Sequence, residues 1–561
     1  MLLVVLLPAA SARGQANVRQ EIQPLVQGKP VERMMQGGDL HKYQVPLSAG
    51  QHLEAVVDQR GIDVVFTAFR PDGTKITEID SPNGAQGPEP ISITATTSGV
   101  YQLEVRSLEA NAAPGRYEIR IEELLSAAQY QRRLADERAR DEALVSRLGS
   151  QAIALKSVTA GSGFDDLMPL KEILRDVRVV GLGEATHGTR EFFQARHRLL
   201  EFLVKEMGFT VLAVEGSYAA FVKINDYVLH GVGNQAEVLA AQKYWILDTE
   251  EVAAMIDWLR AHNQTVPDDK KVKFLGIDPN ANELAMKAVT DYLAKVAPDR
   301  VTSVEAVFRQ IRPEDIKAIN FQPTVVEGAQ LLELYKLVSY LVLHKADFVR
   351  QTSAEAFEKT LQHLRLVVQF AEFNSPRNVD GGGTRDGYMA ENFQYVVNRE
   401  KPDTRFVVLA HNAHISKRDT DKFPAMGSYL HKTFGNGYYA FGFAFNEGEF
   451  QAQVTGERNP RVQVFKLGPA AERTVDWYFA RVGIPNFIID FRRLSDDKVT
   501  SQWLQTPHRM HWVGAIFSDK WSESQWTQPF VLSRDFDGLI FIDKTTAARP
   551  TPSGIRKGAL E

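Results

Sequence analysis

Six short apolar runs between residues 177 and 542 constrain the fold of this chain more than any other feature. Each run is dominated by apolar residues and bounded by polar ones, at residues 177–182, 210–214, 272–277, 405–410, 438–443 and 538–542. Strands of a parallel sheet have this pattern because helices cover both faces, whereas half-exposed strands alternate apolar and polar residues. Segments with helical periodicity lie between the runs. We therefore predict an α/β fold with a mostly parallel sheet and flanking helices.

The N-terminal region has a different pattern, in which apolar and polar residues alternate over short stretches. Between residues 41 and 122, stretches such as "HLEAVVDQ" and "YQLEVRS" are separated by turn sequences such as "PDG" and "SPNG". This spacing predicts a small all-β sandwich. The charge-dense sequence of residues 124–155 is rich in helix formers and predicts a connecting helix.

From residue 280 to about residue 400 the sequence shows helical periodicity and no convincing strand. An insertion of this length between two strands is expected to form a helical cap over one edge of the sheet. The predicted organisation is a signal peptide at 1–16, a β-sandwich accessory domain at 17–123, a helical linker at 124–160, an α/β domain at 161–550 with its helical insertion at about 280–400, and a flexible tail at 551–561.

The first residues and the overall charge bear on location and partners. "MLLVVLL" is followed by "ASA", whose small residues suit a signal peptidase, so we expect export to the periplasm or the medium. No later segment reaches the roughly 20 apolar residues that span a bilayer, so we predict no membrane span. The formal net charge of −5, without a long basic run, argues against nucleic acid as a partner.

Polar residues that could carry chemistry follow four of the predicted strands. In an open parallel sheet the loops at the carboxyl ends of the strands converge, and ligands bind there. These positions hold Glu184 and His187 after the first strand, Glu215 after the second, Asp278 after the third, and His411 and His414 after the fourth. We predict that these side chains form one site. Five other histidines fall in predicted helices and receive no function: His197, His230, His262, His344 and His363.

The loop "GLGEATHG" after the first strand resembles a phosphate-binding loop only superficially. Its third glycine is displaced from a dinucleotide fingerprint, and "TR" stands where a P-loop carries Lys-Ser or Lys-Thr. A glutamate in the loop would also repel phosphate. Nucleotide binding is therefore disfavoured.

A hydrolytic interpretation has a positive mechanism. The His187 imidazole can take a proton from water, while Glu184 or Glu215 fixes its tautomer and stabilises the imidazolium. The chain has no cysteine and no G-x-S-x-G motif, so directly activated water is favoured over a covalent acyl-enzyme. Structural alternatives stay open, because His187 could bond a loop carbonyl and Glu215 could cap a helix.

Metal-dependent hydrolysis is a further alternative. His411 and His414, three residues apart, could join carboxylates in a zinc or manganese site. The chain has no H-E-x-x-H motif, and the ligands would come from four separate loops. We therefore predict no cofactor and keep a divalent metal as the alternative.

Several blocks of the α/β region resemble the erythromycin esterase family in sequence and in order. They are "VVGLGEATHGTREFFQARHRLLEFLV", "GFTVLAVEGSY", "FLGID", "TRDGYMAENFQYV", "VVLAHNAHI" and "FDGLIFIDKTT", and they span residues 165–546. The resemblance implies an α/β core with helical additions and hydrolysis of the lactone of fourteen-membered macrolides. The N-terminal pattern "SGVYQLEVRS…GRYEIRIEE" resembles the pre-peptidase C-terminal-like domain of secreted enzymes.

The resemblance also implies roles for individual residues. The histidine of "GEATHG", which the family uses as general base, corresponds to His187. The glutamates correspond to Glu184 and Glu215, and the first histidine of "AHNAH" to His411. Arg385 of "TRDGYMAEN" corresponds to a family arginine near the site. We assign these first four residues to catalysis, and Arg385, His414 and Asp278 to substrate binding.

The sequence thus predicts an exported hydrolase that cleaves a small-molecule ester or lactone, with a macrolide as one possible substrate and antibiotic resistance as one possible role. The family also contains succinoglycan-biosynthesis-like proteins, and the leader and sandwich set this chain apart from the resistance esterases, so the substrate stays open. The alternatives are a metal-dependent hydrolase or peptidase that uses the same residues, and a non-enzymatic ligand-binding protein of the cell envelope. The sequence does not predict an oligomeric state.

Overall fold

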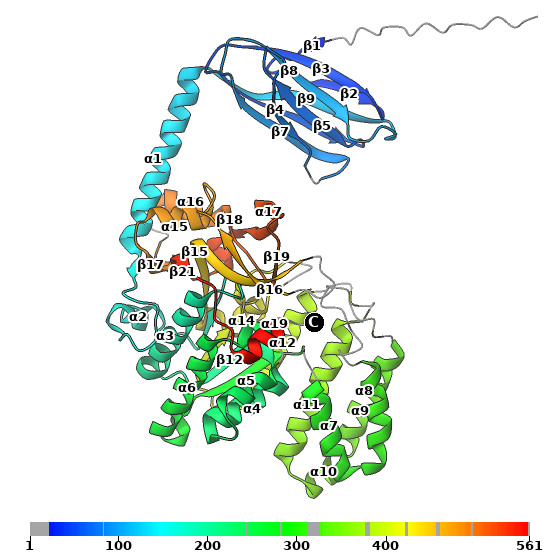
Figure 1. Cartoon of the computed structure of the whole chain (residues 1–561), viewed down its shortest axis with the longest axis vertical. Helices are drawn as coiled ribbons and strands as arrows, with labels where there is room; N and C mark the ends of the chain where they lie inside the picture. The colour runs from blue at the N-terminus through cyan, green and yellow to red at the C-terminus, as the bar shows by residue number, and fades with distance from the viewer. Residues whose placement is uncertain are drawn as a thin grey trace, which may run out of the picture. The chain divides into compact units, whose positions relative to one another are not determined.

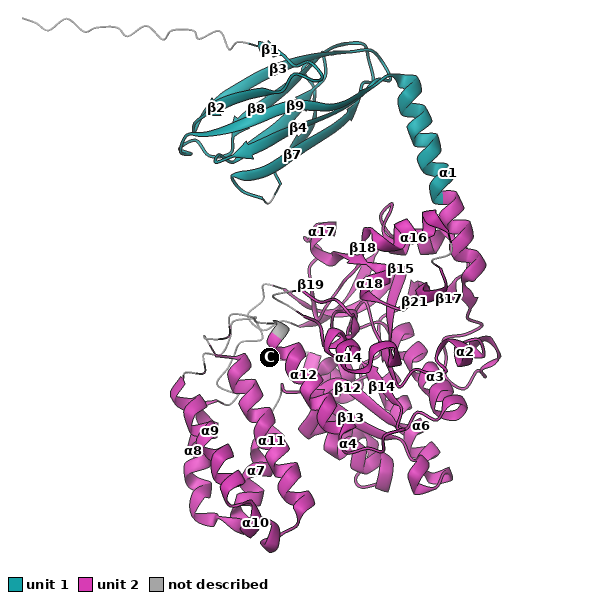
Figure 2. Ribbon diagram, turned by 180° about the vertical axis from the view of Figure 1, so that it is seen from behind, with its two compact units in different colours: residues 1–141 teal, residues 142–561 magenta. Residues whose placement is uncertain are grey.

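The computed structural model describes residues 22–558, except residues 82, 243, 281–282, 312–325, 327, 376–377, 379–381, 421–423, 456–460 and 495–496. It divides into two compact units, Met1–Asp141 and Glu142–Glu561 (Figure 2). The long helix α1 (Ala127–Gln151) contains the division between them. The predicted signal peptide at 1–16 lies outside the described residues and stays a prediction.

The first unit consists of two antiparallel-rich sheets with a common apolar core. One sheet has the order β1-β3-β8-β5-β6 and the other β2-β9-β4-β7. Side chains on β8 are buried at every second position, as at Tyr101, Leu103 and Val105, so one face of the strand joins the core. A β-rich N-terminal region is thus confirmed. Its strands are β1 (Ile22–Pro24), β2 (Val31–Met35), β3 (Leu40–Leu47), β4 (His52–Arg60), β5 (Val64–Phe69), β6 (Lys75–Ile79), β7 (Gln86–Thr94), β8 (Gly99–Ser107) and β9 (Gly115–Leu125).

The second unit is built on one large sheet. Its strands, in spatial order, are β10 (Ile153–Ala154), β17 (Asn486–Asp490), β21 (Gly538–Thr545), β15 (Tyr438–Val454), β11 (Val179–Leu182), β14 (Phe406–Leu409), β12 (Val211–Ser217) and β13 (Lys273–Asp278). Pairing is parallel from β21 to β13, and β17 and β10 add an antiparallel edge. The short strands β16 (Val462–Leu467) and β19 (Ile516–Phe517) pair with the far end of β15. Each of the six apolar runs contains or overlaps one of the strands from β21 to β13.

Helices cover both faces of this sheet (Figure 1). Val180 and Leu182 of β11 pack into the cluster beneath α3 (Arg190–Met207), α4 (Tyr218–His230) and α6 (Glu250–Thr265). Val179 packs into the opposite cluster, which includes residues of α12 (Gly382–Val397), α14 (Met426–Phe434) and α15 (Val475–Arg481). Both faces are apolar, which explains why the strands read as continuous apolar runs. The mixed α/β character of the fold is confirmed.

The region after the edge strand β13 is helical throughout its described part. It comprises α7 (Glu283–Val296), α8 (Val301–Gln310), α9 (Gly328–Leu343), α10 (Lys345–Gln351) and α11 (Ala354–Phe373), and these helices have a core of their own (Figure 1). The chain then enters α12, which packs against β13 and returns to β14. This arrangement brings the start of α12 to the same end of the sheet as the loop after β13.

The C-terminal segment corrects one prediction. Residues 551–561 were expected to form a flexible tail, but Pro552–Gly558 form helix α19. Asp248, which is fully buried, accepts hydrogen bonds from Ser553 Oγ at 2.5 Å and Lys557 Nζ at 2.6 Å. A buried carboxylate needs such donors, and they hold the segment in place. The partner lies some three hundred residues earlier, so no local pattern could have revealed it.

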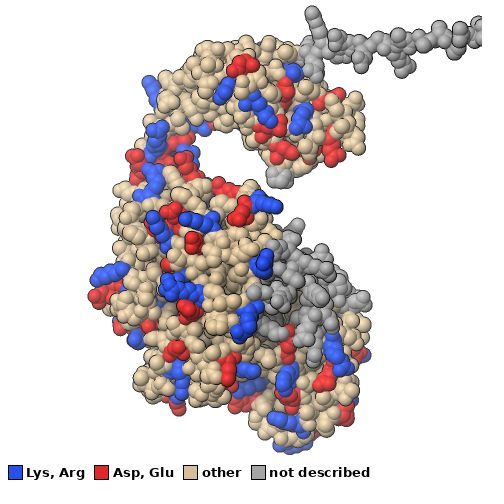
Figure 3. All heavy atoms as spheres, viewed as in Figure 1, with Lys and Arg blue, Asp and Glu red and all other residues tan. Residues whose placement is uncertain are grey.

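Lys and Arg side chains are interspersed with Asp and Glu on the face drawn in Figure 3. In the described part of the chain, no helix combines the length and the apolar content that crossing a bilayer requires.

Candidate active site

The predicted site residues lie at one end of the sheet because the strand ends are in register. Leu182 of β11 pairs with Leu409 of β14, and Leu409 pairs in turn with Val214 of β12. The loops that follow these strands therefore leave the sheet side by side. Between Val214 and Ser217 the pairing of β12 with β13 is irregular, and Glu215 lies in this irregularity. Such a break in a ladder re-aims a side chain that regular pairing would direct along the pleat.

Glu184 and His187 form a hydrogen-bonded pair in the loop after β11. His187 Nδ1 lies 2.6 Å from Glu184 Oε1, and both side chains are buried. Arg196 of α3 donates to the second oxygen, Glu184 Oε2, and also to the carbonyl oxygens of Gly183 at 2.8 Å and Ala410 at 2.6 Å. A carboxylate held in this way makes Nδ1 the protonated nitrogen of His187, which leaves the lone pair on Nε2.

Gly183, at the start of this loop, is required because the Asn412 side chain approaches it closely, and not because a phosphate binds there. A Cβ atom at Gly183 would overlap Asn412 Oδ1. That amide is fixed, because Oδ1 accepts from Phe443 N at 2.9 Å and Nδ2 donates to Phe443 O at 2.8 Å. Asn412 N also donates to Glu184 O at 2.9 Å. Asn412 therefore joins the loops after β11 and β14 to strand β15.

Replacing Gly183 with alanine should lower the free energy of unfolding by about 1–3 kcal/mol, because a methyl group in a filled space forces its neighbours apart. Urea denaturation measures the change. Gly468→Ala is the matched control, since nothing lies within 4 Å of a Cβ at that position, and it should change the free energy by less than about 0.5 kcal/mol. Equal stability of Gly183→Ala and Gly468→Ala would contradict this packing.

His411 lies beside His187 and is a neutral hydrogen-bond donor. The two ring centroids are 4.9 Å apart. Burial, followed by the neighbouring His187, lowers the pKa of His411 well below its usual value. His411 Nδ1 accepts from Ala413 N at 3.2 Å as the N-cap of α13 (Asn412–Ile415), so the proton is on Nε2. Nε2 makes a long contact of 3.3 Å to Val513 O.

Glu215 is the centre of a second, ionic cluster. Its Oε1 accepts from Arg385 Nη2 at 2.9 Å and lies 3.2 Å from His414 Nε2. Its Oε2 accepts from the backbone N of His411 at 3.0 Å. Arg385 also pairs with Asp278 at 2.5 Å. Although burial alone would raise it, the pKa of Glu215 is held well below its usual range by His414 and Arg385.

These contacts distinguish the two glutamates. Glu184 bonds the His187 ring, whereas Glu215 holds the backbone of His411 and is saturated by cations. Glu215 is therefore ionised, and each of its carboxylate oxygens contacts a donor. Arg385 is likewise occupied by two carboxylates, Glu215 and Asp278.

Sequence reasoning missed several residues that complete the site. Arg196 fixes Glu184, and Asp386 lies 2.9 Å from His414 Nδ1 and accepts from Met426 N at 2.7 Å. Trp512 packs edge to face on His411 with centroids 5.0 Å apart, and Val513 N donates to Ala185 O at 2.8 Å. Arg196 stands in "QARHRLL" of α3, where Arg198 follows two residues later, so no local pattern singled it out. Trp512 and Val513 follow β18 (Pro507–His511) and come from a distant part of the chain.

Because of the ionic cluster, we expect the stability of the fold to fall as pH rises from neutral to alkaline values. Burial opposes the charged form of His414, but Asp386 and Glu215 raise its pKa from 6.5 to about 10. His414 therefore contributes stability fully below pH 6.5, progressively less as pH rises, and none above about 10. The melting temperatures of the wild type and His414→Gln should accordingly converge as pH rises through this window. A constant difference across the window would show that His414 is not charged in the folded state.

A metal site is the remaining question about these residues. Among the residues that the structure describes, no group of three or more His, Asp and Glu side chains is arranged to hold a metal ion. Glu184, Glu215 and Asp278 are engaged by arginines instead. The expectation of no cofactor, with a divalent metal as the alternative, stays a prediction.

Comparison with known proteins gives consistent results. The family model described as erythromycin esterase matches residues 204–545. Erythromycin esterase type II of Escherichia coli is 26% identical over 413 residues, which cover 69% of this chain and 94% of that protein. A Bacillus cereus crystal structure aligns with a TM-score of 0.63 at 23% identity, over 73% of this chain and 99% of that one. The open conformation of an erythromycin esterase mutant aligns with a TM-score of 0.54 at 16% identity, over 70% and 96%.

Proposed function

The chain belongs to the erythromycin esterase family, and we propose that it is an exported hydrolase that cleaves an ester or lactone with water activated by His187. The observation that carries this proposal is the Glu184–His187 pair. Nδ1 of His187 is tied to a carboxylate, and no hydrogen bond to its Nε2 is found within the described residues. His187 Nε2 therefore has a free lone pair at the end of the strands, and such a nitrogen is suited to take a proton from water.

The first step is attack on the carbonyl carbon. Water donates a proton to His187 Nε2 as its oxygen bonds to that carbon, and the carbonyl oxygen becomes an oxyanion. Glu184 stabilises the imidazolium that forms, and Arg196 holds Glu184 in place by donating to its second oxygen. Both effects lower the barrier because the charges are fixed before the reaction begins.

His411 is the donor best placed for the oxyanion. It is neutral, its proton is on Nε2, and the 3.3 Å contact of that atom with Val513 O is weak enough to be exchanged. Arg385 is saturated by two carboxylates and is better suited to hold Glu215, and through it the backbone of His411. In the second step the imidazolium of His187 protonates the departing alkoxide, which yields one acid and one alcohol group and restores the base.

Turnover of a substrate panel tests this function. The purified protein is incubated with fourteen-membered macrolides, aryl esters and polysaccharide esters, and products are identified by mass spectrometry. We expect at least one of them to be hydrolysed, with the mass of one water gained. Thermal stabilisation by these compounds without turnover of any would instead indicate a binding protein.

Dependence on metal is tested on the same protein. After dialysis against a chelator and metal analysis, the proposed mechanism predicts full activity in the metal-free sample. Activity that disappears and returns on addition of zinc or manganese would support a metal-dependent hydrolase.

A further inference from the structure

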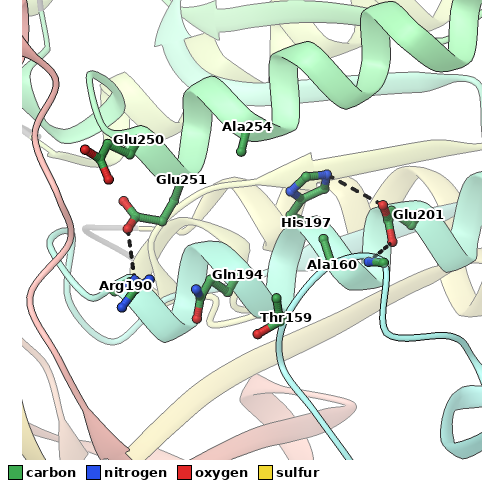
Figure 4. Close-up of a pocket in the computed structure, with 10 residues that line it drawn as sticks. Thr159, Ala160, Arg190, Gln194, His197, Glu201, Glu250, Glu251 and Ala254 are labelled. Carbon is green, nitrogen blue, oxygen red and sulfur yellow. Dashed lines mark hydrogen bonds and ion pairs between the residues drawn. The ribbon is translucent and has the colours of Figure 1, made fainter.

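A cavity lies between α3 and α6 and is lined by none of the candidate active-site residues (Figure 4). Its volume is 460 Å³, within the range of about 300–1,000 Å³ typical of small-molecule sites. One polar face of α3 forms one wall, the first turns of α6 form the other, and a loop before α2 (Leu170–Ile173) closes one end. The lining residues are Thr159, Ala160, Gly161, Arg190, Gln194, His197, Glu201, Glu250, Glu251 and Ala254.

His197 and Glu201 are buried in this cavity and lack adequate partners. They are 7% and 4% exposed, respectively. Within the described residues His197 Nε2 makes no hydrogen bond, and it lies 3.9 Å from Glu201 Oε1. Among the residues that the structure describes, Glu201 Oε2 accepts from Gly161 N alone, at 2.7 Å. In the described part of the chain no lysine or arginine pairs with Glu201.

The remaining charges of the cavity do not compensate Glu201. Arg190 pairs with Glu251 at 3.3 Å, and Glu250 pairs with Arg549 at 3.8 Å. His197 is neutral, because burial lowers its pKa to about 4. The cavity therefore presents a buried carboxylate beside a neutral imidazole, and a buried anion without a cationic partner carries a large desolvation cost.

We propose that this cavity binds a small organic ammonium ion whose N–H groups donate to the Glu201 carboxylate and to His197 Nε2. The two acceptor atoms are 3.9 Å apart, so one nitrogen can lie about 2.9 Å from both. Ala160 and Ala254 contact the carbon part of the ligand. An anionic ligand would be repelled by the three glutamates, and a neutral alcohol would leave the charge of Glu201 uncompensated.

Isothermal titration of the whole protein with butylamine and 1,4-diaminobutane tests this site. Butanol is the matched neutral probe, and ionic strength is held constant. We expect saturable binding of the amines and none of butanol. His187→Asn should bind the amines as the wild type does, so that this result is independent of ester hydrolysis. No saturable binding of either amine, or equal binding of butanol, would overturn the proposal.

Substitutions of residues that line the cavity test whether the amine binds there. Glu201→Gln should weaken amine binding by about tenfold or more, the effect of losing one charged contact. Glu250→Gln is the matched control at the rim and should leave the affinity within about twofold. Ala254 is exposed, so Ala254→Phe should obstruct the cavity and abolish binding without lowering the melting temperature. Wild-type affinity in Ala254→Phe and Glu201→Gln would place the amine elsewhere and refute the site.

Discussion

Replacing His187 with asparagine is expected to lower kcat/KM for ester hydrolysis by about 100-fold to 10,000-fold, the usual contribution of a general base. Asparagine is a suitable replacement because its amide nitrogen can still donate to Glu184 Oε1, which His187 Nδ1 approaches to 2.6 Å. The variant therefore keeps the buried carboxylate satisfied while it removes the basic nitrogen. Steady-state kinetics on any substrate that the wild type hydrolyses measure the loss.

The same substitution at an exposed histidine is the control. His431 of α14 is exposed, and its Nδ1 lies 3.2 Å from Gly435 O. His431→Asn should retain wild-type kinetics, and both variants should unfold near the wild-type temperature. Ester hydrolysis at the wild-type rate by a folded His187→Asn variant would remove His187 from the mechanism.

Replacing Arg196 with methionine is expected to lower the free energy of unfolding by about 3–5 kcal/mol, because it leaves a buried charge without its partner. Arg196 and Glu184 are each 3% exposed. The arginine also satisfies the carbonyl oxygens of Gly183 and Ala410, so its loss affects the loops after β11 and β14 together. Urea denaturation gives the free energy, and activity should fall as well because Glu184 would no longer be held.

Two further variants separate charge from packing. Arg196→Lys keeps the charge but loses the planar fork that reaches several acceptors, so an intermediate loss is expected. In the Arg196→Met background, Glu184→Gln removes the unpaired anion and should recover part of the stability. A double-mutant cycle gives the coupling between the two residues. Additive effects of the two substitutions would show that the pair is not coupled.

The strands of the α/β unit could be predicted because their signal is local. A strand that is buried on both faces reads as an apolar run whatever its neighbours are, and Val179 and Val180 show why, since they enter opposite cores. The spatial order of the strands is set by contacts across the sheet and could not be read in the same way. Neither could α19, because its donors meet Asp248, which lies far away in the sequence.

The residues of the site that directly follow strands could be predicted from the sequence. Glu184, Glu215, Asp278 and His411 follow neighbouring strands, and the structure brings them to one end of the sheet. Their partners were not predictable, because Arg196 lies in a helix that appeared purely structural and Trp512 lies in a loop far along the chain. These partners also distinguish the two glutamates. Glu184 bonds the His187 ring, while Glu215 is held by cationic side chains.

Chemical rescue tests the central claim, that the His187 imidazole activates water, most directly. The measurement is the rate of ester hydrolysis by His187→Ala, with and without free imidazole in the buffer, corrected for the reaction of imidazole alone. We expect imidazole to restore part of the lost activity, in proportion to its unprotonated fraction, because the small ring can occupy the space beside Glu184. Hydrolysis by His187→Ala at the wild-type rate without imidazole would contradict the account.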